Sequence, residues 1–158
     1  MSDAPHRVLL VDDEQVITSS LKAFLNAETS YEVIAFNSPR QALAFLKHNP
    51  VDLVIADLLM PDMNGIEFLS ATKRLHPDAV RILLTGYADK DNAIRAINEV
   101  GLYQYLEKPW DSEHLRHVIA TGLERRRLLK RLHDKIAEAE RVLGELRDIE
   151  RQIKANLT

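Results

Sequence analysis

The chain has 158 residues, of which 46% are hydrophobic, and its formal net charge is −3. This length suits one compact domain with an appendage, and the charge provides no global positive field that would attract nucleic acid or an anionic membrane. Cysteine is absent, which excludes disulfides. The N-terminus lacks the apolar core of a signal peptide, and no apolar run reaches membrane-spanning length. We therefore expect a soluble, cytoplasmic protein that does not contact a membrane.

Five short apolar runs alternate with segments of helical periodicity along most of the chain. The apolar runs predict strands over Arg7–Val11, Tyr31–Phe36, Val51–Asp57, Val80–Leu84 and Leu102–Leu106. The segments between them predict helices that begin after Glu14, at Pro39, after Gly65 and at Asp89. Strands that alternate with helices in this way are typical of an α/β protein with a five-stranded, parallel, doubly wound sheet.

Four of the predicted strands end in residues that carry chemistry. Asp12 and Asp13 follow the first strand, Asp57 ends the third, Thr85 follows the fourth and Lys108 comes soon after the fifth. A parallel sheet brings these residues to the edge where α/β proteins bind their ligands. Three neighbouring carboxylates repel one another unless a cation intervenes, and oxygen ligands without a complete protein cage suit Mg²⁺. A carboxylate nucleophile beside a metal, an ammonium group and a hydroxyl indicates a site that forms and breaks an aspartyl phosphate.

The pattern changes after Trp110, because no proline follows and strong helix formers dominate from Ser112 to the end. Hydrophobic residues, with one polar member, then recur at alternating spacings of three and four: Leu129, Leu132, Ile136, Ala139, Leu143, Leu146, Glu150, Ile153 and Leu157. A single helix here would be roughly 70 Å long at about 1.5 Å per residue and would not bury this stripe against a small domain. The heptad repeat predicts a homodimeric coiled coil, with one domain over 1–122 and a helical extension over 123–158.

The chain from about Val8 to Ala120 resembles the receiver domain of two-component response regulators, a flavodoxin-like fold whose archetype is the chemotaxis response regulator. The resemblance rests on the acidic pair after the first strand, on Asp57 and the loop that follows it, and on three further positions. In chain order these residues are Asp12, Asp13, Asp57, Met60-Pro61-Asp62-Met63-Asn64-Gly65, Thr85, Tyr105 and Lys108-Pro109. They occur in the family's order and at the family's places, and as a set they are very specific.

The resemblance implies that Asp57 accepts a phosphoryl group from a histidine kinase or a phosphotransfer protein. It also implies that Mg²⁺ is bound by Asp13, Asp57 and the backbone carbonyl of Leu59, with Asp12 acting mostly through water. Lys108 would contact the phosphoryl group from beside a cis peptide bond to proline. Such a domain catalyses only its own phosphorylation and dephosphorylation, so we expect a regulator rather than an enzyme.

The resemblance further implies a switch formed by two residues. On phosphorylation Thr85 would move to hydrogen-bond a phosphoryl oxygen, and Tyr105 would fill the space that the threonine leaves. Gly86 stands where alanine is frequent in the family and should still admit phosphate. Leu59 and Tyr87 occupy positions that tune hydrolysis of the acyl phosphate. Bulky Tyr87 would shield the phosphoacceptor from water, which predicts a moderately long-lived phosphoryl state.

Two organisations of such a regulator stay open. The chain is either a complete small regulator that works by dimerising or the receiver and signalling helix of a longer protein. The heptad repeat is still running at Leu157, without a terminating glycine or proline, which favours a longer regulator with an effector domain. The stretch GLYQYLEKPWD also looks like receivers attached to cyclic-dinucleotide phosphodiesterases of the HD-GYP type or to ATP-dependent transcriptional activators.

Three other classes of protein compete with this interpretation. A metal-dependent phosphohydrolase with an aspartyl nucleophile usually has a second acid two places later, where this chain has Leu59. A constitutive coiled-coil scaffold with a vestigial receiver would not need the intact acidic site. A nucleotide-binding fold of the Rossmann type requires a glycine-rich turn after the first strand, and this chain has none there.

The charged residues of the extension favour a solvated helix face. The basic run over 125–131 is followed by acidic residues and by no helix-turn-helix, so we do not expect direct binding of nucleic acid. His114 and His117 lie one turn apart without a third ligand, which argues against a metal site. His133 lacks the following asparagine- or threonine-proline of a sensor-kinase phosphohistidine motif.

Overall fold

The computed structural model describes residues 4–86 and 89–157 of the chain. Within these residues, one parallel sheet has the strand order β2-β1-β3-β4-β5. The strands are β1 (Arg7–Val11), β2 (Glu32–Phe36), β3 (Leu53–Asp57), β4 (Val80–Thr85) and β5 (Gln104–Glu107). The helices are α1 (Gln15–Glu28), α2 (Pro39–Leu46), α3 (Gly65–Leu75), α4 (Lys90–Val100) and α5 (Ser112–Asn156). This architecture confirms the predicted parallel, doubly wound α/β sheet.

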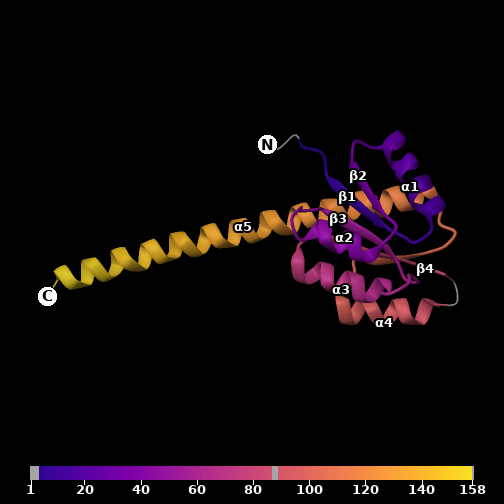
Figure 1. Ribbon diagram of the computed structural model, residues 1–158. Helices are drawn as coiled ribbons and strands as arrows, with labels where there is room; N and C mark the ends of the chain where they lie inside the picture. The colour runs from indigo at the N-terminus through magenta and orange to yellow at the C-terminus, as the bar shows by residue number, and fades with distance from the viewer. Residues whose placement is uncertain (1–3, 87–88, 158) are drawn as a thin grey trace. The chain divides into compact units, whose positions relative to one another are not determined.

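Helices cover both faces of the sheet (Figure 1). On one face, Leu10 and its neighbours on β3 and β4 pack with α1 and with the first three turns of α5. On the other face, Leu9 and its neighbours pack with α2, α3 and α4. Successive residues of a strand point to opposite faces, so a strand covered on both sides must be apolar throughout. That is why the central strands appear in the sequence as unbroken apolar runs.

The strand boundaries differ slightly from those predicted. Tyr31, Val51 and Leu102 precede their strands instead of beginning them, and Thr85 is the last residue of β4. Val51 and Leu102 are nevertheless buried in the core. Burial, and not ladder pairing, therefore accounts for their apolar character.

Local signals fix the ends of several helices. The Ser38 hydroxyl accepts a hydrogen bond from the backbone N–H of Gln41 at 3.3 Å, and Pro39 begins α2. The Asn64 side chain accepts one from the backbone N–H of Glu67 at 2.8 Å and so caps α3. Gly101 has φ 73°, a left-handed conformation that ends α4 and favours glycine.

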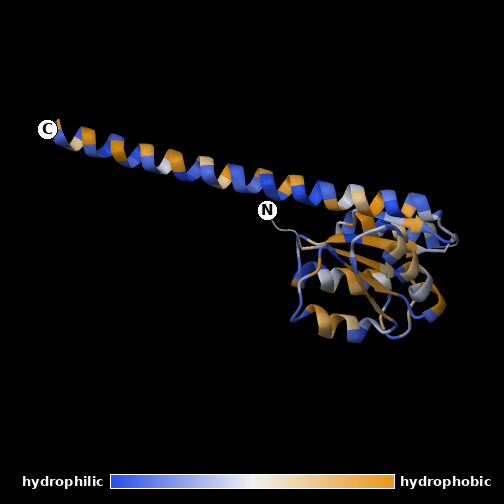
Figure 2. Ribbon diagram, turned by 90° about the horizontal axis from the view of Figure 1, so that it is seen from above, coloured by the Kyte–Doolittle hydropathy of each residue, from blue (hydrophilic) through white to orange (hydrophobic). Residues whose placement is uncertain are grey.

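Internal contacts divide the chain into one compact unit over Met1–Leu123 and a second over Glu124–Thr158. The second unit is helical through Asn156, and its hydrophobic residues are exposed at intervals along the helix (Figure 2). Among the described residues, no helix combines the length and hydrophobicity that crossing a membrane requires. Tyr87, the predicted shield of the phosphoacceptor, lies outside the described residues.

Candidate functional site

Three carboxylates meet at the carboxyl edge of the sheet. Asp57 is the last residue of β3, Asp12 directly follows β1, and these two strands are hydrogen-bonded neighbours in the sheet. Asp13 is next in the chain and is exposed, whereas the other two are buried. One carboxylate oxygen of each of the three residues lies within 4.8 Å of those of the other two. The strand order thus produces the acidic cluster that the sequence predicts.

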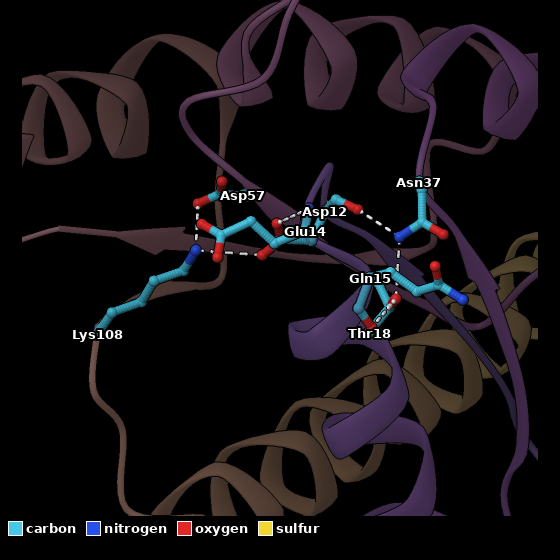
Figure 3. Close-up of polar contacts among 7 residues, drawn as sticks. All are labelled: Asp12, Glu14, Gln15, Thr18, Asn37, Asp57 and Lys108. Atoms are coloured by element: carbon cyan, nitrogen blue, oxygen red, sulfur yellow. Dashed lines mark hydrogen bonds and ion pairs between the residues drawn. The ribbon is translucent and has the colours of Figure 1, made fainter.

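Lys108 is the cation that approaches this cluster (Figure 3). Its Nζ lies 3.0 Å from Oδ1 of Asp57 and 3.1 Å from Oδ2 of Asp12. The backbone N–H of Lys108 donates to the carbonyl of Thr85 at 2.8 Å, which fixes the loop after β5 against the end of β4. The peptide bond between Lys108 and Pro109 is cis, as the resemblance implies. Lys108, in the loop after β5, therefore forms ion pairs with the carboxylates at the ends of both β1 and β3.

The charges at this edge are not balanced. Burial raises the pKa of Asp57, and the charges of Asp13 and Glu14 raise it further, although the ammonium group of Lys108 lowers it. The pKa of Asp12 is raised by burial and by Asp57, against the lowering effects of the Glu14 backbone N–H and Lys108. Burial by itself lowers the pKa of Lys108, but the hydrogen bonds and charges of Asp57 and Asp12 outweigh burial and raise it. The site therefore favours an additional cation.

Asp12 is held in place by its own turn and by an asparagine. Its side-chain Oδ1 accepts from the backbone N–H of Glu14 at 2.9 Å. Its backbone carbonyl accepts from Nδ2 of Asn37 at 2.8 Å, and the same Nδ2 donates to the hydroxyl of Thr18 at 3.0 Å (Figure 3). The sequence motifs did not single out Asn37. Asn37 directly follows β2, just as Asp12 directly follows β1. Its place after a predicted strand is therefore the sequence feature that could have pointed to the site.

The loop after Asp57 folds back onto β3. Leu58 donates to the carbonyl of Leu84 at 2.8 Å and accepts from the backbone N–H of Gly65 at 2.8 Å. A Cβ atom on Gly65 would collide with the backbone carbonyl of Asp57, so only glycine permits this close approach. The Leu59 side chain is 63% exposed beside the site. The loop thus holds the backbone of Asp57, the predicted phosphoacceptor, in place.

The two predicted switch residues lie on adjacent strands. Thr85 ends β4 and is buried, and its hydroxyl donates to the carbonyl of Gly86 at 2.7 Å. Tyr105 lies on β5, where it pairs with Leu83 and packs, half-buried, against the core on the α4 side of the sheet. The structure thus places the threonine and the tyrosine on adjacent strands, with Tyr105 opposite the residue two positions before Thr85.

The donor set fits Mg²⁺. Three carboxylates supply hard oxygen ligands, and the exposed position of Asp13 leaves one side open to water and to a phosphate oxygen. Such a cation would also offset charge, because three carboxylates lie together and Lys108 brings a single ammonium group to two of them.

Comparison with known proteins identifies the family. The family model of the response regulator receiver domain matches residues 8–120. The hydrogenase transcriptional regulatory protein HoxA of Cupriavidus necator is 36% identical over 133 residues, which cover 84% of this chain and 27% of HoxA. The signal receiver domain of an HD domain-containing protein from Pseudomonas fluorescens Pf-5 is 35% identical with a TM-score of 0.73, covering 78% of this chain and 98% of that chain.

The beryllofluoride-activated NtrC4 receiver domain dimer is 38% identical with a TM-score of 0.70, covering 76% of this chain and 98% of that chain. The chain spans about a quarter of the length of the curated relatives it matches. These similarities confirm the resemblance that the motifs indicate. The chain belongs to the response regulator receiver domain family.

Proposed function

We propose that this chain is a phosphorylation-controlled receiver whose Asp57 accepts a phosphoryl group from a histidine kinase or a phosphotransfer protein. The observation that carries the proposal is the position of Lys108, with its Nζ 3.0 Å from Asp57, at the edge of a three-carboxylate cluster. A carboxylate oxygen of Asp57 attacks the phosphorus of the donor phosphohistidine. The new P–O bond forms as the P–N bond breaks, and the imidazole leaves with the electron pair.

The neighbouring residues have distinct roles in this reaction. Asp12, Asp13, Asp57 and the backbone carbonyl of Leu59 would hold Mg²⁺, which when bound neutralises carboxylate charge and stabilises charge on the phosphoryl oxygens. Lys108 stands close enough to Asp57 to contact a phosphoryl oxygen once the acyl phosphate has formed. The buried hydroxyl of Thr85 exchanges its bond to Gly86 for one to the phosphoryl group, and Tyr105 follows it into the vacated space.

The output of the receiver passes through α5. In this proposal residues 1–122 form the receiver, and 123–158 form a signalling extension that pairs as a homodimer in the cytoplasm. The chain is the regulatory part of a longer regulator, and the domain beyond it, not the receiver, acts on the target. Relatives that carry the name transcriptional regulatory protein support this arrangement, and so does the fraction of their length that the chain spans.

Phosphorylation without a kinase tests the proposal. The chain is incubated with Mg²⁺ and acetyl phosphate, and phosphoryl groups per chain are counted by intact mass spectrometry. We expect one acid-stable, base-labile phosphoryl group in the parent chain and none in Asp57→Asn. The matched control is Asp62→Asn, which removes an exposed carboxylate from the same loop and should leave uptake unchanged. Uptake that persists in Asp57→Asn would refute the assignment.

A further inference from the structure

The helical unit beyond Leu123 exposes more hydrophobic residues than one heptad repeat accounts for. The repeat that runs through Leu129, Ile136 and Leu143 leaves out Val142 and Ile149, whose side chains are 43% and 52% exposed. It also includes a glutamate, Glu150. Figure 2 shows hydrophobic residues recurring at intervals along α5. A seam that buries Glu150 while the adjacent, apolar Ile149 stays outside it is unfavourable, so the first repeat does not describe the C-terminal part of this surface.

A second heptad repeat overlaps the first. It has the same alternating spacing of three and four and consists of Ala139, Val142, Leu146, Ile149 and Ile153. The first repeat is apolar from Leu129 to Leu146 and is then interrupted by Glu150. The second is apolar from Ala139 to Ile153, but its continuation toward the N-terminus is interrupted by Lys135. Each repeat therefore fails in the half of the helix where the other is intact.

We propose that this part of α5 binds a second copy of the chain, in parallel, through a seam that changes from the first repeat to the second between Leu143 and Ile149. The proposal deepens the proposed function and rests on the homodimer assumed there. The change replaces one spacing of four by a second spacing of three, from Leu143 to Leu146 to Ile149. This is equivalent to inserting three residues into the heptad repeat, which locally overwinds a coiled coil. With this seam, Lys135 and Glu150 both lie at its flanks and no charged residue is buried.

The charges along the flanks of the first repeat support a second copy of this chain as the partner. In a parallel pair, Lys135 of one helix faces Glu140 of the other across the first repeat, which places opposite charges together twice by symmetry. Across the second repeat, Glu145 would face Glu150 of the second copy. Each of these carboxylates has a cation on its own helix, because Arg141 lies 3.4 Å from Glu145 and Lys154 lies 3.2 Å from Glu150.

Cysteine cross-linking in the full chain tests the seam, and the absence of natural cysteine makes each single substitution unambiguous. Two pairs of adjacent residues separate the possibilities: Lys135→Cys against Ile136→Cys, and Ile149→Cys against Glu150→Cys. Asp148→Cys, outside both repeats, is the control. A disulfide needs Cβ atoms about 3.8 Å apart, so we expect cross-linking on the order of five-fold greater at 136 than at 135, and at 149 than at 150.

Each alternative predicts a different pattern. Cross-linking at Glu150→Cys equal to or above that at Ile149→Cys would mean that the first repeat continues, and would overturn the change of register. Greater cross-linking at 135 than at 136 would mean that the second repeat already forms the seam there, and would also overturn the change of register. Cross-links confined to one level of the helix indicate an antiparallel pair, which also contradicts the proposal. Light scattering of the parent chain separates these failures from loss of the homodimer: a monomer refutes the seam and the homodimer, and a mass above two chains refutes the two-helix seam. Phosphoryl uptake at Asp57 tests the receiver function independently of either result.

Discussion

The Nζ of Lys108 lies 3.0 Å from Oδ1 of Asp57, and this ion pair connects the loop after β5 to the end of β3. Lys108 is also the partner of Asp12, at 3.1 Å, so one ammonium group serves two buried carboxylates. Burial raises the pKa of both carboxyl groups despite this partner. Burial is the largest cause of both shifts, so these carboxylates are costly to keep charged and the stability of the receiver should respond to changes among the three groups.

Removing the ammonium group should destabilise the fold. We expect Lys108→Ala to lower the free energy of unfolding by about 2 kcal/mol, because two buried carboxylates lose their cation. The loss is smaller than for a fully buried ion pair, since the lysine is partly exposed and water screens its charge. Urea denaturation in the presence of a chelator measures the loss. Lys22→Ala, an exposed lysine on α1, is the matched control and should change stability by less than about 0.5 kcal/mol. Equal losses in the two variants would contradict the role of Lys108.

Mg²⁺ should stabilise the receiver, because it binds the folded cluster and not the unfolded chain. At a free concentration of one hundred times Kd, the gain is about 2.7 kcal/mol. Thermal unfolding across a Mg²⁺ titration measures it. Asp13→Asn should reduce the gain strongly, whereas Asp62→Asn should retain it, since Asp62 lies outside the carboxylate cluster. An unchanged response in Asp13→Asn would argue against this metal site.

The pH dependence of stability should change when Asp57 is replaced. Burial raises the pKa of Asp57, so the folded state holds the proton more tightly than the unfolded state. The stability from this group is present below the ordinary carboxyl pKa and is lost as the pH rises through the folded-state pKa. Without metal, Asp57→Asn should therefore be more stable than the parent chain near about pH 7, with a difference that shrinks toward about pH 4. Denaturation at a series of pH values tests this, and a less stable Asp57→Asn at neutral pH would contradict it.

Two glycines of the same chain should respond in opposite ways to alanine. A Cβ atom on Gly65 meets the carbonyl of Asp57 and the side chain of Leu83, so Gly65→Ala should cost about 2–3 kcal/mol of stability. Gly144 lies within α5, and a Cβ atom there would meet no atom within 4 Å, so Gly144→Ala should raise helix stability by up to about 1 kcal/mol. Circular dichroism during denaturation measures both, and a neutral Gly65→Ala would show that the loop after Asp57 yields easily.

The sheet and the acidic edge were predictable because both depend on local patterns. A strand buried on two faces must be an apolar run, and residues that follow parallel strands must share an edge. Arg81 shows what such patterns miss. It is only 8% exposed within β4. Its guanidinium donates to the carbonyls of Pro77, Ala79 and Gly101 at 3.0–3.1 Å, and these hydrogen bonds compensate its burial. Gly101 is distant in sequence, so this compensation appears only once the chain is folded.

The helices show the same limit. In α4, Ala93 is fully buried whereas the adjacent Ile94 is 43% exposed, so an apolar residue in a helix does not by itself mark the face that packs on the core. For α5, the predicted long helix is confirmed over Ser112–Asn156, whereas pairing with a second copy stays a prediction. A heptad pattern predicts which residues of a helix form an apolar stripe, but it does not identify the chain that packs against that stripe.

Chemical trapping of the phosphoryl group tests the assignment of Asp57 most directly. Borohydride reduces an acyl phosphate to an alcohol and leaves free carboxylates unchanged, so the phosphorylated aspartate becomes homoserine. After phosphorylation of the parent chain with Mg²⁺ and acetyl phosphate, peptide mass spectrometry locates the converted residue. We expect homoserine at position 57 and at no other aspartate. Conversion of Asp12 or Asp13 instead, or no conversion in a chain that carries a full phosphoryl group, would contradict Asp57 as the phosphoacceptor.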